Sequence, residues 1–195
     1  SQPQTVVPRP WHPGKEESFE IELPHGWVSR PLGEPFAAPA ALWREVREHF
    51  LLTTDRDVAW LQWRYGPSSP GGALVGLFDV KGDLRAWYSY RLSERGRSFP
   101  LRVFKLLDMM AVPSDAQAIE ACGADTIARG RRLAHIVEAR GMRQEFRRGL
   151  LAAGFSERRL PSNPFLGCAR PNKAAALPAE DAWHLVPADG DGGFS

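Results

Sequence analysis

The stretch LRVFKLLDMMAVP, residues 101–113, decides the fold. Its first twelve residues are mostly apolar and contain no glycine or proline, and Pro113 ends the run. A short apolar run that a proline ends is typical of a strand buried on both faces of a sheet. We therefore predict a central strand over residues 101–112, with Asp108 as its only carboxylate.

A β-hairpin is expected just before this strand. Residues 74–80 and 84–92 both read as strands, and the turn-forming residues 81–83 (KGD) lie between them. Further upstream, residues 19–23 alternate between apolar and polar side chains before Pro24, which predicts one more short strand. The hairpin and the central strand together indicate a sheet that is largely antiparallel.

Two helices are expected between the first strand and the hairpin. Residues 39–50 place Leu42, Val46 and Phe50 four apart, which is the spacing of one helical face. Thr54 precedes Asp57 by three residues, as in a capping box, and predicts a second helix that begins there.

Beyond the central strand, helices and short strands are expected to alternate. Ser114 is expected to cap a helix to about residue 133, although Gly123 and Gly130 weaken it and a break inside is possible. A strand over residues 135–139 and a helix that ends at Gly154 follow. Residues 165–169 and 183–186 are candidates for two last strands.

Composition limits the classes of protein that fit. The chain has 195 residues, a net charge of +2 and only two cysteines, which suits one cytoplasmic domain without disulfides. We expect a linker over residues 1–17, the folded domain over 18–187 and a tail over 188–195. No histidine or cysteine spacing indicates a metal site, and no window reaches the roughly 20 apolar residues of a membrane span.

The order of these elements resembles a known superfamily. The stretch LLAAGF, residues 150–155, is similar to the helix and "GF" step of the GNAT (acyl-CoA N-acyltransferase) superfamily, and residues 106–113 resemble its central strand. The resemblance spans roughly residues 36–170. It implies an α/β (α+β) fold in which helices flank a mixed, mostly antiparallel sheet. It also implies transfer of an acetyl or other acyl group from acyl-CoA to an amine or hydroxyl.

One branch of this superfamily fits better than the rest. The stretch WLQWRY, residues 60–65, with Pro67 and Pro70, resembles the segment that opens the second lobe of two-lobed GNAT-like proteins. Residues 183–191 (WHLVPADGD) resemble their C-terminal ending. These proteins serve bacterial polysaccharide and envelope biosynthesis, so the resemblance implies a sugar or other small-molecule acceptor. It also implies a second GNAT-like lobe, or a homodimer, as a partner.

The sequence departs from the GNAT pattern at two places. GNAT enzymes hold the CoA pyrophosphate with a Gln/Arg-x-x-Gly-x-Gly/Ala loop at a helix start. Residues 113–120 (PSDAQAIE) have no such loop, and Asp115 and Glu120 would repel a phosphate there. Many members carry a proton-donating tyrosine where this chain has Leu150. A lobe that keeps the fold but binds an acceptor or partner is therefore a competing hypothesis.

Candidate site residues follow from both readings. Asp108 is a candidate general base, or else a buried carboxylate that pairs with a backbone group or an arginine. Glu138 is a second candidate base that acts through a water, or else an ion-paired surface residue. The backbones of Met110, Ala111 and Val112 would line acyl-CoA, which is the expected co-substrate; no tightly bound cofactor and no metal is expected.

Aromatic and basic side chains supply the candidate substrate contacts. Trp63 and Tyr88 are candidates for stacking on a sugar, and Arg64 for binding a carboxylate or phosphate; packing and ion pairing are the alternatives. Seven arginines lie within residues 129–148. Because no aromatic residues are interleaved with them, nucleic-acid binding is disfavoured relative to a solvated helix face.

Overall fold

A six-stranded mixed sheet forms the centre of this computed structural model, which describes residues 19–67, 72–96, 100–140, 143–157 and 183–184. The strand order is β1-β2-β4-β5-β6-β7. Neighbours are antiparallel except β6 and β7, which are parallel. The strands are β1 (Ile21–Glu22), β2 (Val28–Leu32), β4 (Ala73–Phe78), β5 (Leu84–Arg95), β6 (Leu101–Ala111) and β7 (Ile136–Ala139).

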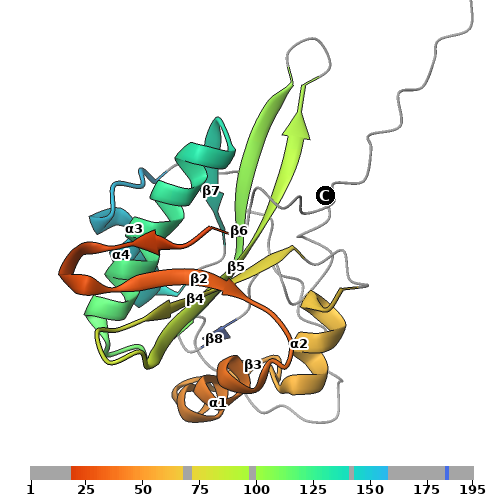
Figure 1. Ribbon diagram of the computed structural model, residues 1–195, viewed down its shortest axis with the longest axis vertical. Coiled ribbons are helices and arrows are strands. Elements are labelled where there is room, and N and C mark those ends of the chain that lie inside the picture. Colours follow the sequence, from red (N-terminus) through yellow and green to blue (C-terminus); the bar gives the residue numbers. More distant parts are fainter. Residues whose placement is uncertain (1–18, 68–71, 97–99, 141–142, 158–182, 185–195) are drawn as a thin grey trace, which may run out of the picture.

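Four α-helices accompany the sheet within the described residues, and Figure 1 shows α1 near α2 and α3 beside α4. A separate parallel pair, β3 (Leu52–Thr53) with β8 (Trp183–His184), lies outside the main sheet. The helices are α1 (Ala37–Val46), α2 (Val58–Tyr65), α3 (Ala116–Leu133) and α4 (Gln144–Ala152), with short 3-10 turns η2 (Pro24–Gly26) and η3 (Arg47–His49). The expected α/β fold, with helices that flank a mixed and mostly antiparallel sheet, is confirmed.

Consecutive residues of β5 show which helices cover which face of the sheet. Tyr88 contacts Asp125 of α3, whereas Ser89 contacts Tyr65 at the end of α2. Neighbouring side chains in a strand point to opposite faces. Therefore α2 and α3 cover opposite faces of the sheet.

The predicted elements differ from the observed ones in several places. The short strand β3 was not predicted, and the helix caps expected at Thr54 and Ser114 are instead Asp57 and Asp115. The strand β2 was not predicted, because Pro31 interrupts its apolar pattern, and it pairs with β1 and β4. The helix expected over residues 39–50 ends at Val46 and continues as η3. The break considered inside α3 is absent, because that helix runs unbroken from Ala116 to Leu133.

Glycines bring α3 and α4 into close contact. A Cβ atom placed on Gly123 would lie 2.7 Å from the Cβ of Ala153, and one on Gly149 would overlap Cγ2 of Ile119. Real side chains do not approach so closely, so only glycine allows this helix spacing. Gly123, which lowers the helix propensity of α3, therefore allows α3 to pack closely against α4.

Several expectations concern residues outside the described part of the chain. The linker over 1–17, the tail over 188–195 and the possible strand over 165–169 all fall there. None of the helices in the described ranges has the length and apolar character to cross a membrane.

Candidate functional site

A bulge in β6 positions the carboxylate predicted from the sequence. Ser89 pairs with Asp108 and the next residue, Tyr90, pairs with Leu106, so Leu107 is an extra residue on β6. A bulge of this kind bends a strand and redirects its side chains. Asp108 therefore lies opposite Ser89 on the face that α2 covers.

The carboxylate of Asp108 is held in a buried ion pair. Its Oδ2 accepts a hydrogen bond from Nε of Arg56 at 2.7 Å, and its Oδ1 accepts one from the backbone N–H of Met109 at 2.8 Å. Both charged side chains are fully buried. A paired, buried carboxylate of this kind is one of the two alternatives that the sequence left open for Asp108.

Arg56 is fixed from several directions. Its Nη1 donates to Oγ1 of Thr53 at 2.9 Å and to the carbonyl oxygen of Thr54 at 2.6 Å. Its guanidinium carbon lies 5.4 Å from the ring centroids of both Trp43 and Trp60, within the range of cation–π attraction. The chain thus compensates the buried charge with partners from three segments around β6.

Tyr65 completes this cluster, which we call the Asp108 cluster (Arg56, Tyr65, Ser89 and Asp108). Its hydroxyl lies 2.8 Å from Oγ of Ser89. Burial raises the pKa of the Tyr65 phenol well above its ordinary value, and the nearby charge of Asp108 adds to the rise. Tyr65 therefore stays protonated at neutral pH.

The three predicted substrate residues do not lie together. The side chain of Trp63 is 67% exposed on α2, and the guanidinium carbon of the buried Arg64 lies 5.7 Å from its ring centroid. Tyr88, in contrast, is fully buried on the opposite face of the sheet. Trp63 is thus exposed on α2 while its neighbour Arg64 is buried, and the sheet separates Tyr88 from both.

Tyr88 belongs to a second buried network, which sequence reasoning missed. Its hydroxyl donates to Oδ2 of Asp125, and Nε of Arg129 donates to the hydroxyl oxygen at 3.0 Å. Ser29 donates to Oδ1 of Asp125 at 2.6 Å. Burial, followed by the charge of Asp125, raises the pKa of Tyr88 well above its ordinary value. The spacing of Cys122, Asp125 and Arg129 along one helical face was the signal available for it.

Arg129 also bears on the arginine-rich segment. It is fully buried, whereas Arg147 pairs at the surface with Glu157 and Arg143 with Glu145 at 2.9 Å. These arginines therefore do not form one basic surface.

Glu138 lies in β7 opposite Lys105, not opposite Asp108. Its two carboxylate oxygens accept from Nη2 and Nη1 of Arg95 at 2.8 and 3.2 Å. The structure therefore places Glu138 in a partly exposed ion pair beside Lys105 of β6, away from Asp108.

Met110 and Ala111 lie where β6 extends past its last pairing with β7. That pairing ends at Leu106 and Ala139, while β6 continues to Ala111 along β5. Both side chains are fully buried, and Val112 is partly exposed at the end of the strand. The parallel strands β6 and β7 therefore pair only along residues 103–106 of β6.

The N-terminus of α3 carries a carboxylate. Oδ1 of Asp115 accepts a hydrogen bond from the backbone N–H of Ala118 at 3.0 Å, which is an N-cap interaction. Its Oδ2 accepts one from Nη2 of Arg85 at 2.7 Å. The helix start that follows β6 is therefore capped by the chain's own negative charge.

Among the described residues, no group of three or more His, Cys, Asp and Glu side chains is arranged to hold a metal ion. Cys122 is fully buried, and burial raises the pKa of its thiol well above the ordinary value.

Several solved structures with similar folds are described as acetyltransferases. One described as a probable acetyltransferase has a TM-score of 0.54 and 16% identity, covering 74% of this chain and 98% of its own. Glucosamine-6-phosphate N-acetyltransferase from Arabidopsis thaliana has a TM-score of 0.51 and 9% identity, and the match covers 72% of this chain and 99% of that one. An aminoglycoside acetyltransferase from an uncultured soil metagenomic sample, in complex with sisomicin, has a TM-score of 0.52 and 6% identity. The match covers 73% of this chain and 97% of that one. No protein-family model and no curated protein matches the sequence.

These likenesses define the class of fold. The chain has the fold of the GNAT acetyltransferases, with its six-stranded mixed sheet and its long strand β6 followed by α3. At 6–16% identity this likeness concerns the arrangement of the backbone.

Proposed function

We propose that this chain is a GNAT-fold lobe that serves acyl transfer by engaging an acceptor or a partner lobe, and that it does not itself hold acyl-CoA. The observation that carries the proposal is the Asp115 carboxylate at the N-terminus of α3. In the resemblance described above, the CoA pyrophosphate would approach this helix start.

The physical reason is competition for the same groups. A helix N-terminus attracts anions through its free N–H groups and its partial positive charge. Here the carboxylate of Asp115 already accepts a hydrogen bond from one of those N–H groups and also pairs with the guanidinium of Arg85. A pyrophosphate at this position would have to displace that carboxylate or lie beside a like charge.

The state of Asp108 supports the same proposal. A general base needs a free oxygen within reach of the substrate proton. Both oxygens of Asp108 already accept hydrogen bonds, and its charge is neutralised by Arg56. The pair is better suited to hold β6, β3 and α2 together than to exchange protons.

The acceptor is proposed to be a small amine or hydroxyl compound of the sugar type. Two of the similar structures carry names that specify amino-sugar substrates, glucosamine 6-phosphate and an aminoglycoside. On this chain, Trp63 offers an exposed ring on α2. An exposed aromatic ring suits stacking on a sugar.

Thermal unfolding with acetyl-CoA tests the proposal. A ligand that bound with a Kd of about 10 μM would, at about 1 mM, stabilise the native state by about 2.7 kcal/mol. For a domain of this size that corresponds to a Tm rise of about 5–10 °C. We expect a change of less than about 1 °C. A saturable rise of several degrees would reject the proposal.

A second candidate is acyl transfer by this chain alone. It is favoured by the segment of β6 beyond its last pairing with β7, where the backbones of Met110, Ala111 and Val112 would line the thioester. The acceptor amine would attack the thioester carbonyl, CoA would leave as the thiolate, and Asp108 or Glu138, the latter through a water, would take the amine proton. In that case Asp108→Asn, or Glu138→Gln if Glu138 is the base, abolishes acceptor-dependent release of CoA, whereas our first proposal expects no such release in the unmodified chain.

A further inference from the structure

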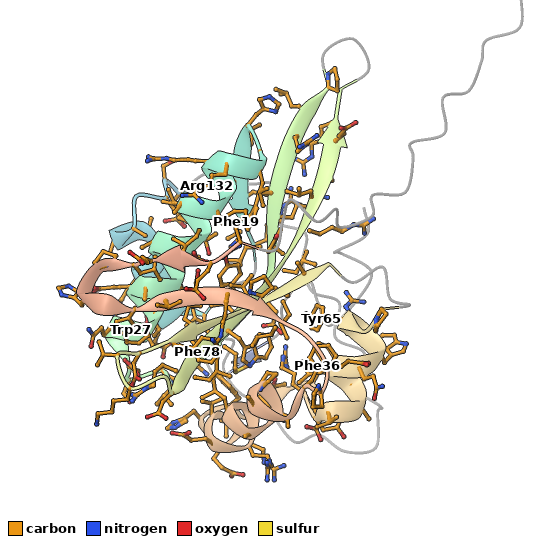
Figure 2. The ribbon with its side chains drawn as sticks, in the orientation of Figure 1. Phe19, Trp27, Phe36, Tyr65, Phe78 and Arg132 are labelled. Carbon is orange, nitrogen blue, oxygen red and sulfur yellow. The ribbon has the colours of Figure 1, made fainter. Side chains whose placement is uncertain are left out.

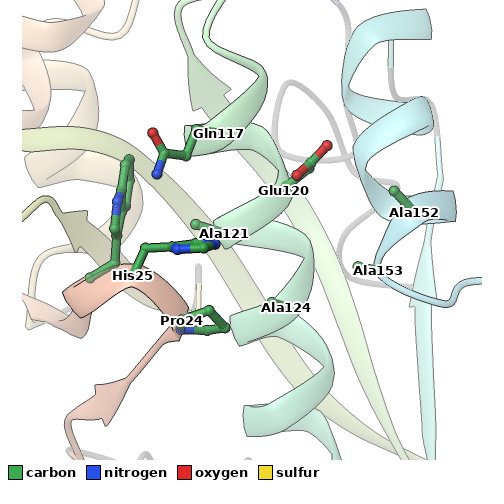
Figure 3. A pocket seen from close by; sticks show the side chains of 9 residues that line it. Pro24, His25, Gln117, Glu120, Ala121, Ala124, Ala152 and Ala153 are labelled. Carbon is green, nitrogen blue, oxygen red and sulfur yellow. The ribbon is translucent and has the colours of Figure 1, made fainter.

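A cavity of about 500 Å³ lies between the η2 turn, α3 and the end of α4, as Figure 3 shows. It is on the α3 side of the sheet, whereas the Asp108 cluster is on the α2 side. In Figure 2, Trp27 of the cavity and Tyr65 of the Asp108 cluster accordingly lie in separate parts of the molecule. The cavity is therefore a different site from the one described above.

The lining combines an apolar floor with a few polar groups. Alanines of α3 and α4, among them Ala121 and Ala152, leave the space open because their side chains are short. Trp27 also borders the cavity, with most of its ring buried in the core. The polar groups are His25, Gln117 and Glu120. Small-molecule sites typically have this size and this mixture of apolar walls and a few polar side chains.

His25 is held over the cavity by a strained turn. Its φ of 63° lies in the left-handed region, which is uncommon for residues other than glycine. The hydrogen bond from the N–H of Leu23 to the carbonyl oxygen of Trp27, 2.8 Å, closes the turn. Figure 3 shows the imidazole pointing across the cavity toward Ala121. Strain of this kind persists where the surrounding structure maintains it, and it gathers at ligand sites.

Charge decides which ligand fits. Glu120 is the carboxylate among the described lining residues, and those residues include no lysine or arginine. A carboxylate attracts an ammonium group and repels phosphate. The apolar face of a sugar ring packs against the alanine side chains that line the cavity. Gln117 and His25 supply hydrogen-bonding groups for hydroxyls.

We propose that this cavity binds a polar molecule of the amino-sugar class. This molecule is of monosaccharide size and carries a primary amine and no negative charge. Its ammonium group lies against Glu120 and its ring against the alanine floor. The inference goes beyond the proposed function, because it concerns the other face of the sheet and holds whether or not acyl-CoA binds.

Titration with D-glucosamine, followed by ¹H–¹⁵N NMR, tests the proposal. We expect saturable shifts, up to about 50 mM ligand, in the Trp27 indole signal and in the amides of residues 117–124. D-Glucose, which lacks the ammonium, is expected to bind about 10-fold more weakly, and glucosamine 6-phosphate more weakly than glucosamine. No saturable shift, or shifts that map to another face, would overturn the proposal.

Matched variants separate the cavity from non-specific effects. Glu120→Gln is expected to weaken glucosamine binding about 10-fold without affecting glucose, and Ala121→Leu to abolish binding of both by filling the cavity. The controls are Glu48→Gln and Ala41→Leu, exposed residues of η3 and α1 on the α2 side. Equal glucosamine affinity in the unmodified chain and in Glu120→Gln would overturn the role of charge. If Ala121→Leu unfolds, the Glu120→Gln comparison alone decides.

Discussion

At the scale of single residues, the part of the chain that the structure describes contains two buried ionic networks, one on each face of the sheet. Arg56 with Asp108 lies on the α2 face, and Arg129 with Asp125 and Tyr88 on the α3 face. The sequence predicted the position of Asp108 in a buried strand. It did not predict Arg56 as the partner, because 52 residues separate the two and no local pattern connects them.

Removing Arg56 is expected to destabilise the fold strongly. Arg56→Ala leaves a buried carboxylate uncompensated, which costs about 3–5 kcal/mol of unfolding free energy. Chemical denaturation measures it, with Arg47→Ala, from the exposed pair with Glu48, as the control expected to change by less than about 0.5 kcal/mol. The double variant Arg56→Leu with Asp108→Leu is expected to cost less than the two single changes combined. Equal effects at positions 56 and 47 would contradict the ion pair.

The buried tyrosines predict a loss of stability at alkaline pH. The pKa values of Tyr65 and Tyr88 are raised in the folded state, so the unfolded chain releases these protons first as pH rises above about 10. Their contribution to stability is complete below that pH and falls above it. Ultraviolet titration should show that Tyr65 and Tyr88 ionise only when the protein unfolds. Reversible ionisation of both near pH 10, with native circular dichroism retained, would contradict their burial.

At the scale of elements, the contact between α3 and α4 shows what the sequence could and could not indicate. Helix periodicity predicted both helices, and β-hairpin signals predicted β4 and β5. Gly123 was interpreted as a weak point, because propensity describes an isolated helix; its use as a contact surface depends on α4, which is distant in the sequence. The strand β2 was missed for a similar reason, since its pairing with β4 outweighs Pro31.

Substitution of Gly149 tests the helix contact. In an unhindered helix Gly→Ala stabilises by up to about 1 kcal/mol. Here the added methyl group would overlap Ile119, so Gly149→Ala is expected to destabilise by about 1–3 kcal/mol. Gly33→Ala, where nothing lies within 4 Å, is the control and should change stability by less than about 0.5 kcal/mol. A more stable Gly149→Ala protein would show that the helices lie farther apart.

At the scale of the whole molecule, the fold and the chemistry of the site are decided by different features of the chain. The GNAT fold follows from the order of elements, and both the sequence and the structural likenesses give it. A fold alone does not establish activity. What decides the proposed role is local: a carboxylate that caps α3 and a buried arginine that neutralises Asp108. The candidate base was predicted from its place in an apolar strand and from the resemblance, whereas its neutralisation depended on tertiary contacts.

Site-resolved NMR with acetyl-CoA tests the central proposal most directly. At about 1 mM acetyl-CoA, a concentration at which ordinary acyltransferase co-substrates bind well, we predict unchanged amide signals for residues 110–118, at the end of β6 and the start of α3. Saturable shifts in these amides, strengthened when Asp115→Asn removes the capping charge, would show that the chain holds acyl-CoA and would contradict the account.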